Sequence, residues 1–138
     1  MSGRLLVLAA AATLGYAAPA HADPCEGTLP TRAGVQFSGI VRYVGDGDGL
    51  CVGRTADPNE WIEVRLADFN APELHTPGGP AAKAALERLA LQREVICASE
   101  HGHGGRVRSF DRVIARCRIS GASLGDLLRQ AGVAEGGN

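Results

Sequence analysis

Two residues of opposite charge, Arg65 and Glu73, lie eight positions apart in the segment VRLADFNAPELH, residues 64–75. A guanidinium binds phosphate through two parallel hydrogen bonds, and a carboxylate can activate water as a general base. Pro72 disfavours the helical conformation at Ala71 and favours a turn between the two charges. The segment predicts a phosphate-binding arginine beside a general base. The alternative is a strand and its loop with both charges facing solvent.

A glycine-rich cluster, GDGDG, spans residues 45–49 and carries Asp46 and Asp48. Two aspartates separated by one glycine can present oxygen ligands to a hard cation such as Ca²⁺. Leu50 stands where a complete EF-hand loop has an acidic or amide residue, which argues against that loop. The cluster is therefore a candidate cation-binding turn. The alternative is a solvated hairpin turn without a ligand.

A basic stripe follows near the C-terminal end of the sequence. Five arginines fall within 13 positions, namely Arg106, Arg108, Arg112, Arg116 and Arg118. Clustered arginines are typical of phosphate recognition. The alternative is the outward face of an amphipathic strand, because strand alternation alone produces this spacing.

These candidate residues must be positioned by a small set of secondary-structure elements. Alternating or β-branched segments predict five strands, at 35–44, 50–54, 61–66, 93–99 and 112–120. Apolar stripes predict two helices, one from Gly79 and Pro80 to residue 92 and one over 124–132 after Ser123. Five strands with a helix between the third and fourth predict an α+β, mainly β, fold: a five-stranded OB-type Greek-key barrel with two helices.

The domain boundaries follow from composition. Residues 1–22 read as a secretory signal peptide, with Arg4, a short apolar run and an Ala20-His21-Ala22 cleavage signature. An uncleaved anchor is the alternative. We expect an irregular lead-in at 23–34, the barrel domain at 35–134 and a frayed tail at 135–138. The location implied is periplasmic or secreted.

Charge limits the range of partners. Removing the signal peptide leaves 13 basic and 15 acidic residues, a net charge of −2. A nearly neutral chain is not a general binder of polyanions, so any nucleic-acid contact must come from local clusters. We expect a monomer with no membrane contact after cleavage.

Four cysteines remain after cleavage, an even number that favours two disulfides in an exported protein. No C-x-x-C pair is present, which argues against zinc. Cys97 and Cys117 fall on consecutive predicted strands, where a disulfide needs only ordinary Cα spacing. We therefore favour Cys97–Cys117 and Cys25–Cys51 among the three possible connectivities.

Taken together and in order, the DGD turn, the R-L-x-x-x-x-x-P-E segment and an arginine opening the fifth strand resemble the thermonuclease (staphylococcal-nuclease-like) family. The resemblance covers about residues 37–134 and includes the closing helix, LGDLLRQAGVA. It implies an exported, Ca²⁺-dependent phosphodiesterase on an OB barrel. Its substrate would be DNA or RNA, and its products would carry 3′-phosphate and 5′-hydroxyl ends.

The same resemblance assigns roles to individual residues. Arg65, Glu73 and Arg112 match the catalytic side chains of the family. Asp48 and Asn70 match the two metal ligands, the second of which is an aspartate in the family. Asp46 and Asp68 are candidates for additional metal support that would compensate for the charge lost at Asn70.

Three positions depart from the family pattern. Asn70 removes one negative charge from the metal site, and calcium affinity follows ligand charge. Gly49 replaces a threonine, and Asp111 replaces a turn glycine at a position where we expect left-handed backbone geometry. These departures support an alternative, a catalytically weak or inactive OB module that binds nucleic acid or another ligand. A disulfide-stapled structural domain without a ligand is the third hypothesis.

Overall fold

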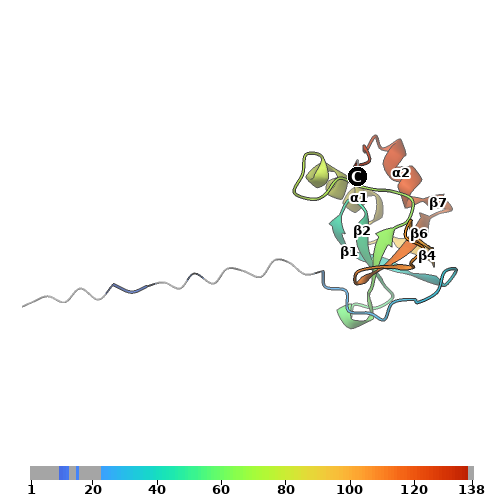
Figure 1. The fold of residues 1–138 in the computed structure, drawn as a ribbon, viewed down its shortest axis with the longest axis horizontal. Helices are drawn as coiled ribbons and strands as arrows, with labels where there is room; N and C mark the ends of the chain where they lie inside the picture. The colour runs from blue at the N-terminus through green and yellow to red at the C-terminus, as the bar shows by residue number, and fades with distance from the viewer. Residues whose placement is uncertain (1–9, 13–14, 16–22, 137–138) are drawn as a thin grey trace, which may run out of the picture.

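The computed structural model describes residues 10–12, 15 and 23–136 of the 138-residue chain (Figure 1). The expected signal peptide therefore lies almost entirely outside the described residues. Residues 23–34 contain neither helix nor strand, in keeping with an irregular lead-in. The described part contains no helix of the length and apolarity needed to cross a membrane.

Five strands make the body of the domain: β1 (Gln36–Asp46), β2 (Gly49–Gly53), β3 (Ile62–Leu66), β4 (Glu94–Ser99) and β6 (Arg112–Ile119). All five correspond to predicted strands, with shifts of one or two residues at most ends. Three short elements had no sequence prediction: a 3₁₀ helix (Pro58–Glu60), β5 (Arg108–Ser109) and β7 (Ala122–Ser123).

The strands close into a barrel. Antiparallel pairing gives the order β3-β2-β1-β4-β6, and a parallel pairing between β3 and β6 joins the two ends. The parallel register sets Val64 beside Val113 and Leu66 beside Ala115. Because every one of the five strands has two neighbours, the barrel has no open edge among them. The OB-type, mainly β fold predicted from the sequence is confirmed.

Two helices lie at one end of the barrel, in the upper part of Figure 1. They are α1 (Gly79–Ala90) and α2 (Leu124–Gln130). Pro80 is in the first turn of α1, where its missing N–H costs nothing. The Ser123 hydroxyl accepts the Asp126 N–H at 3.1 Å and caps α2. The last described residues of the chain lie between the two helices (Figure 1).

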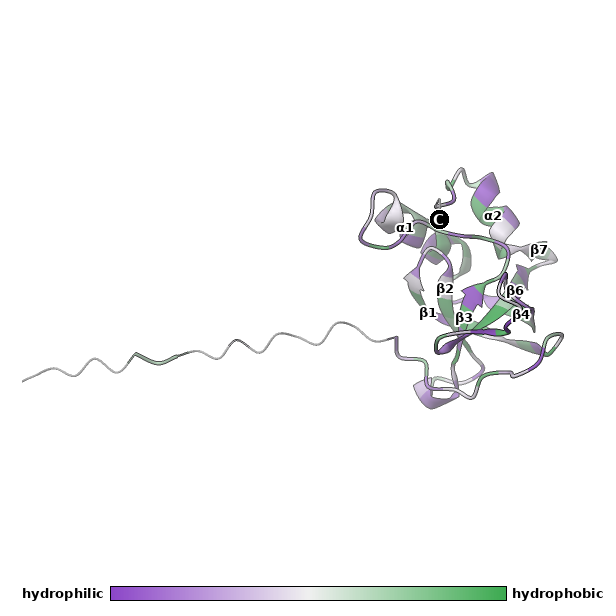
Figure 2. Ribbon diagram, in the orientation of Figure 1, coloured by the Kyte–Doolittle hydropathy of each residue, from purple (hydrophilic) through white to green (hydrophobic). Residues whose placement is uncertain are grey.

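The core fills the barrel and the space under the helices (Figure 2). On β6, strict alternation buries Val113, Ala115, Cys117 and Ile119, as the sequence predicts. Helix α1 contributes Ala82, Ala85 and Leu86, whose small and medium side chains allow close approach to the sheet.

Strand β3 departs from simple alternation. Glu63 shares a face with Trp61 and Arg65, the face opposite the apolar residues, yet Glu63 is only 5 % exposed. The lead-in covers this face, because Gly27 N donates to Trp61 O at 2.8 Å. The face of β3 that points away from the barrel core is therefore a second, partly polar interface, formed with the lead-in.

Both disulfides have the expected partners. Cys97 and Cys117 are opposite each other in the β4–β6 ladder, with Cα atoms 4.0 Å apart. Cys25 and Cys51 join the lead-in to β2, with Cα atoms 5.9 Å apart. The predicted pairing is confirmed, and two disulfides are typical of proteins from oxidising compartments.

Candidate functional site

The candidate site begins where β1, β2 and β3 meet at one end of the barrel. The ladder between β2 and β3 pairs Gly49 with Arg65, and Leu66 N donates to Asp48 O at 2.8 Å. These backbone contacts bring the glycine-aspartate turn beside the end of β3. Two motifs that are separate in the sequence therefore share one location.

Arg65 is held by four protein oxygens. Its Nη2 atom lies 3.0 Å from Asn70 Oδ1 and 3.3 Å from Asp48 Oδ2. Its Nη1 atom donates to the carbonyl oxygens of Phe69, at 2.7 Å, and Leu66. The loop after β3 thus curls around the guanidinium, and Asp48 and Asn70 converge on a single nitrogen.

Asp48 is a buried carboxylate, 5 % exposed. Burial raises the pKa of Asp48 and the nearby Asp46 carboxylate adds to the increase, whereas Arg65 and the Ala71 N–H lower it; the net pKa is about 6. The Ala71 N–H donates to Asp48 Oδ2 at 2.8 Å. Burial therefore outweighs the ion pair with Arg65 in setting this pKa.

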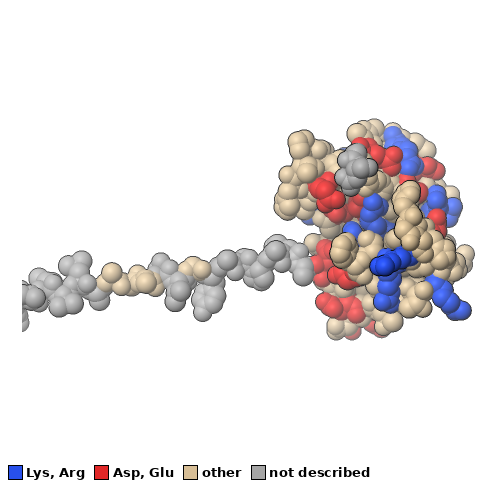
Figure 3. Space-filling model, viewed as in Figure 1, with Lys and Arg blue, Asp and Glu red and all other residues tan. Residues whose placement is uncertain are grey.

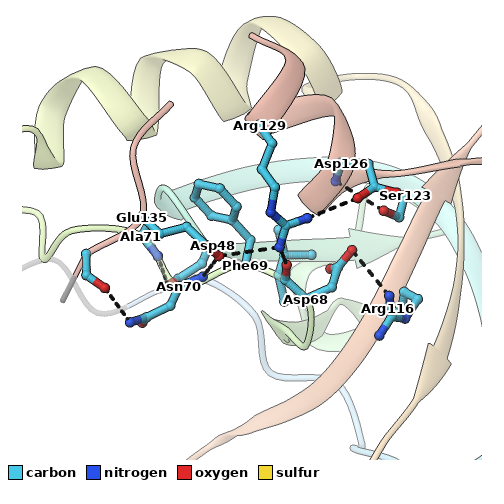
Figure 4. Close-up of polar contacts among 12 residues, drawn as sticks. Asp48, Asp68, Phe69, Asn70, Ala71, Arg116, Ser123, Asp126, Arg129 and Glu135 are labelled. Carbon is cyan, nitrogen blue, oxygen red and sulfur yellow. Dashed lines mark hydrogen bonds and ion pairs between the residues drawn. The ribbon is translucent and has the colours of Figure 1, made fainter. Parts of the chain in front are cut away.

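The side-chain nitrogen and the backbone of Asn70 form hydrogen bonds with the C-terminal segment (Figure 4). Its Nδ2 donates to Gly136 O at 2.9 Å, and its backbone N–H donates to Glu135 Oε1 at 3.2 Å. In return, Gly136 N donates to Asn70 O at 2.7 Å. For Glu135 and Gly136 this differs from the expectation of a frayed end; residues 137–138 lie outside the described part.

The candidate ligand oxygens are of the type that binds a hard cation, but they are few. Asp48 and Asn70 offer carboxylate and amide oxygens, whereas Ca²⁺ takes 6–8 oxygen ligands. Both oxygens now contact Arg65. Within the described ranges, no group of three or more His, Cys, Asp or Glu residues is placed to hold a metal ion. A cation at this point would need Arg65 to shift and further oxygens from solvent or substrate.

The two residues predicted to give additional metal support, Asp46 and Asp68, lie in different surroundings. Asp46 stays at the site, since its Oδ1 accepts the Asp48 N–H at 3.1 Å. Asp68 does not: its side chain is 6 % exposed and lies 3.7 Å from Arg116 Nη1, on the side facing α2 (Figure 4). Neither side-chain carboxylate oxygen of Asp68 has a hydrogen-bond partner among the described residues. Asp68 therefore belongs to a separate charged pair.

Arg112 reaches toward the same turn from β6. A Cβ atom added at Gly49 would lie 2.8 Å from Asp46 Oδ1 and 3.7 Å from Arg112 Nη1. Gly49 therefore leaves room for both side chains. Arg112 also borders a pocket of about 640 Å³ beside Glu63, so it connects the turn to the buried carboxyl of β3.

Glu73 is exposed and lies apart from Arg65. It borders a groove of about 650 Å³ between α1 and the C-terminal segment. Arg65 and Asn70 border a second groove, of about 640 Å³. Among the described residues no hydrogen bond or ion pair involves the Glu73 side chain. Glu135 borders both grooves, so the C-terminal segment adjoins both the groove of the predicted base and the groove of the predicted phosphate-binding arginine.

The turn before β6 differs from expectation. Phe110, with φ of 58°, takes the left-handed conformation that we expected of Asp111. Its ring is 94 % exposed. The left-handed residue is displaced by one position because Ser109 pairs with Arg112 and leaves Phe110 and Asp111 as a two-residue hairpin turn.

Sequence reasoning missed Glu63 and Glu135. Glu63 alternates with the apolar residues of the predicted strand at 61–66, and only the cover provided by residues 23–29 reveals its buried environment. Burial and the adjacent Asp23 carboxyl raise the pKa of Glu63 to about 8. Glu135 was assigned to a frayed tail. Neither residue has a local sequence signal, because both environments come from segments distant in the chain.

Charges of both signs are interspersed on the face shown in Figure 3, without one continuous basic surface. On this face, a polyanion would therefore meet only local groups of basic residues. No protein-family model matches the chain, and no curated protein sequence matches it.

Proposed function

We propose that this chain is an exported phosphodiesterase that hydrolyses nucleic acids with the help of Ca²⁺. The observation that supports this most is the convergence of Asp48, Arg65 and Asn70 at one end of an OB-type barrel. The order of motifs that resembles the thermonuclease family supports it independently of the geometry. The two disulfides are compatible with a periplasmic or secreted location.

The residues have distinct roles in this proposal. Arg65 binds the phosphate by exchanging some of its present oxygen partners for phosphate oxygens. Arg112 approaches the same phosphate from β6 and stabilises charge that grows on its oxygens in the transition state. Glu73 orients or deprotonates the attacking water. Ca²⁺ held by Asp48 and Asn70 would add positive charge beside those oxygens.

The direct test is an assay on single-stranded DNA and on RNA, with and without a chelator. The proposal expects cleavage that requires Ca²⁺ and leaves 3′-phosphate ends. Cleavage of equal rate in the presence of chelator would contradict the metal role. No cleavage of either substrate would contradict the enzymatic function.

A second candidate is a binding module of low or no activity. It is favoured by the engagement of Asn70 with Arg65 and Gly136 and by the separate groove of Glu73. Calorimetry with Ca²⁺ and a nucleoside 3′,5′-bisphosphate separates the two. The enzyme binds both; a module for another ligand binds neither and leaves DNA intact.

A further inference from the structure

Glu135 lines the groove beside Arg65, and the next residue, Gly136, packs on the loop that carries Asn70. Gly136 makes two backbone-level contacts to Asn70, through its N–H at 2.7 Å and its carbonyl oxygen at 2.9 Å. A Cβ added at Gly136 would lie 3.0 Å from Ala71 O and from Pro72. The segment is thus packed directly on the backbone of the loop that carries Asn70 and precedes Glu73.

Glu135 is held by donors that suit an anion. Its Oε1 accepts the Asn70 N–H at 3.2 Å and lies 3.4 Å from Arg129 Nη2. Glu135 and Arg65 also border the same groove. A backbone N–H and the Arg129 guanidinium contact this carboxylate, and the Arg65 guanidinium lines the same groove; such donors recognise a phosphate. In this structure the anion among them is the chain's own carboxylate (Figure 4).

Arg129 is fixed in place independently of Glu135. Its Nη1 donates to Asp126 Oδ1 at 3.0 Å, its Nη2 donates to the Asp68 carbonyl oxygen, and its guanidinium lies 5.7 Å from the centre of the Phe69 ring. These contacts therefore keep the Arg129 guanidinium in place when Glu135 is displaced. Both partners of the Glu135–Arg129 pair are 44 % exposed, and exposed ion pairs contribute little to stability.

We propose that the Asn70 N–H, Arg129 and Arg65 form a subsite for a phosphate of a nucleic-acid strand, and that Glu135 fills this subsite in the free protein. The inference rests on the proposed function, because it assumes that a phosphodiester binds beside Arg65. Glu135 lines both the groove of Arg65 and the groove of Glu73, so a strand that occupies the two grooves together passes over Glu135. Substrate binding therefore displaces the C-terminal segment.

Two variants test the displacement. Glu135→Gln keeps size and an oxygen acceptor but removes the competing charge. Gly136→Val places side-chain atoms about 3.0 Å from Ala71 O and Pro72, closer than ordinary contact, and should weaken the packing of the segment on the loop. Glu94→Gln, at the exposed first residue of β4, makes the same charge change as Glu135→Gln and is its matched control. We expect affinity for a deoxynucleoside 3′,5′-bisphosphate to rise about two- to fivefold in both tail variants, the scale of one exposed ion pair, and to stay unchanged in the control.

A second readout follows the segment itself. In the unaltered protein, the Gly136 amide should be protected from hydrogen exchange, and saturating bisphosphate should abolish that protection. Inorganic phosphate should have the same effect at higher concentration. If Gly136→Val does not fold, the affinity of Glu135→Gln and the exchange measurement together test the proposed displacement.

The outcomes separate the two proposals. Equal affinity in all forms, with the Gly136 amide protected in the complex, overturns the subsite while the proposed function stands. Weaker binding by Glu135→Gln also overturns it, because the carboxylate would then assist the ligand. Absence of bisphosphate and phosphate binding in every form overturns both the subsite and the proposed function.

Discussion

Arg65 and Asn70 are joined by a hydrogen bond of 3.0 Å between Nη2 and Oδ1. The same Nη2 atom lies 3.3 Å from Asp48 Oδ2. The guanidinium thus lies between the two oxygens that the sequence assigns to a cation. Asn70 is also the residue that binds the C-terminal segment, so its identity affects both the cation and the tail.

Replacing Asn70 by aspartate should strengthen cation binding. Asn70→Asp adds a carboxylate beside Asp48 and removes the Nδ2 donor to Gly136 O. We expect affinity for Ca²⁺ to rise by about tenfold or more, because calcium affinity follows ligand charge, and we expect protection of the Gly136 amide to fall. Calorimetry with Ca²⁺ and hydrogen exchange measure the two effects.

Asn59→Asp, on the exposed 3₁₀ helix, adds the same charge away from the site and serves as the control. Unchanged calcium affinity in Asn70→Asp would show that Asp48 and position 70 do not share a cation.

Glu63 makes stability depend on pH. Burial, Asp23 and Asp111 raise its pKa to about 8 from 4.5, while Arg112 opposes the shift. A raised pKa in the folded state stabilises the protein fully below pH 4.5, and this contribution is lost as pH rises through about 8. Thermal unfolding between pH 5 and pH 9 should therefore show falling stability.

Glu63→Gln should flatten that pH profile and be the more stable form above pH 8, because a neutral amide replaces a carboxyl that must ionise. Each pKa unit corresponds to about 1.4 kcal/mol, so the difference should reach at least 1 kcal/mol. Glu87→Gln, on α1, controls for net charge. Parallel profiles for the unaltered protein and Glu63→Gln would contradict the assigned environment of Glu63. Burial raises the pKa of Tyr43, and the nearby carboxyls, Glu63 among them, add to this increase.

The sequence predicted elements whose pattern is local. Alternation along residues 112–120 and 61–66 was sufficient to place β6 and β3, and the positions of Cys97 and Cys117 on neighbouring strands predicted their disulfide. The buried state of Glu63 depends on residues 23–29, which fold over β3 from outside the barrel. The contact between Asn70 and Gly136 spans 66 positions. Such long-range contacts leave no periodic signal in either segment.

The two disulfides should contribute similarly to stability. The Cys97–Cys117 pair encloses a sequence separation of 20 and the Cys25–Cys51 pair one of 26. Chain-entropy arguments give about 3 kcal/mol for loops of this size. Replacing Cys97 and Cys117 together by serine should lower the free energy of unfolding by about that amount, measured by denaturant titration.

The Cys25→Ser, Cys51→Ser double variant should in addition expose Glu63, because the lead-in loses its link to β2. Its pH profile of stability should therefore become flatter, whereas that of the Cys97, Cys117 variant should keep its slope. Identical slopes in the two double variants would contradict the role of the lead-in as the cover of β3.

The central claim is that Glu73 and Arg65 act on one phosphodiester even though they line different grooves in the free protein. The most direct measurement is the rate of single-stranded DNA cleavage by Glu73→Gln compared with Glu87→Gln, at saturating Ca²⁺ and with folding checked by thermal unfolding. The account predicts a loss of about a hundredfold or more for Glu73→Gln, the scale of a general base, with unchanged stability and full activity in Glu87→Gln. Equal cleavage rates in the two variants would contradict it.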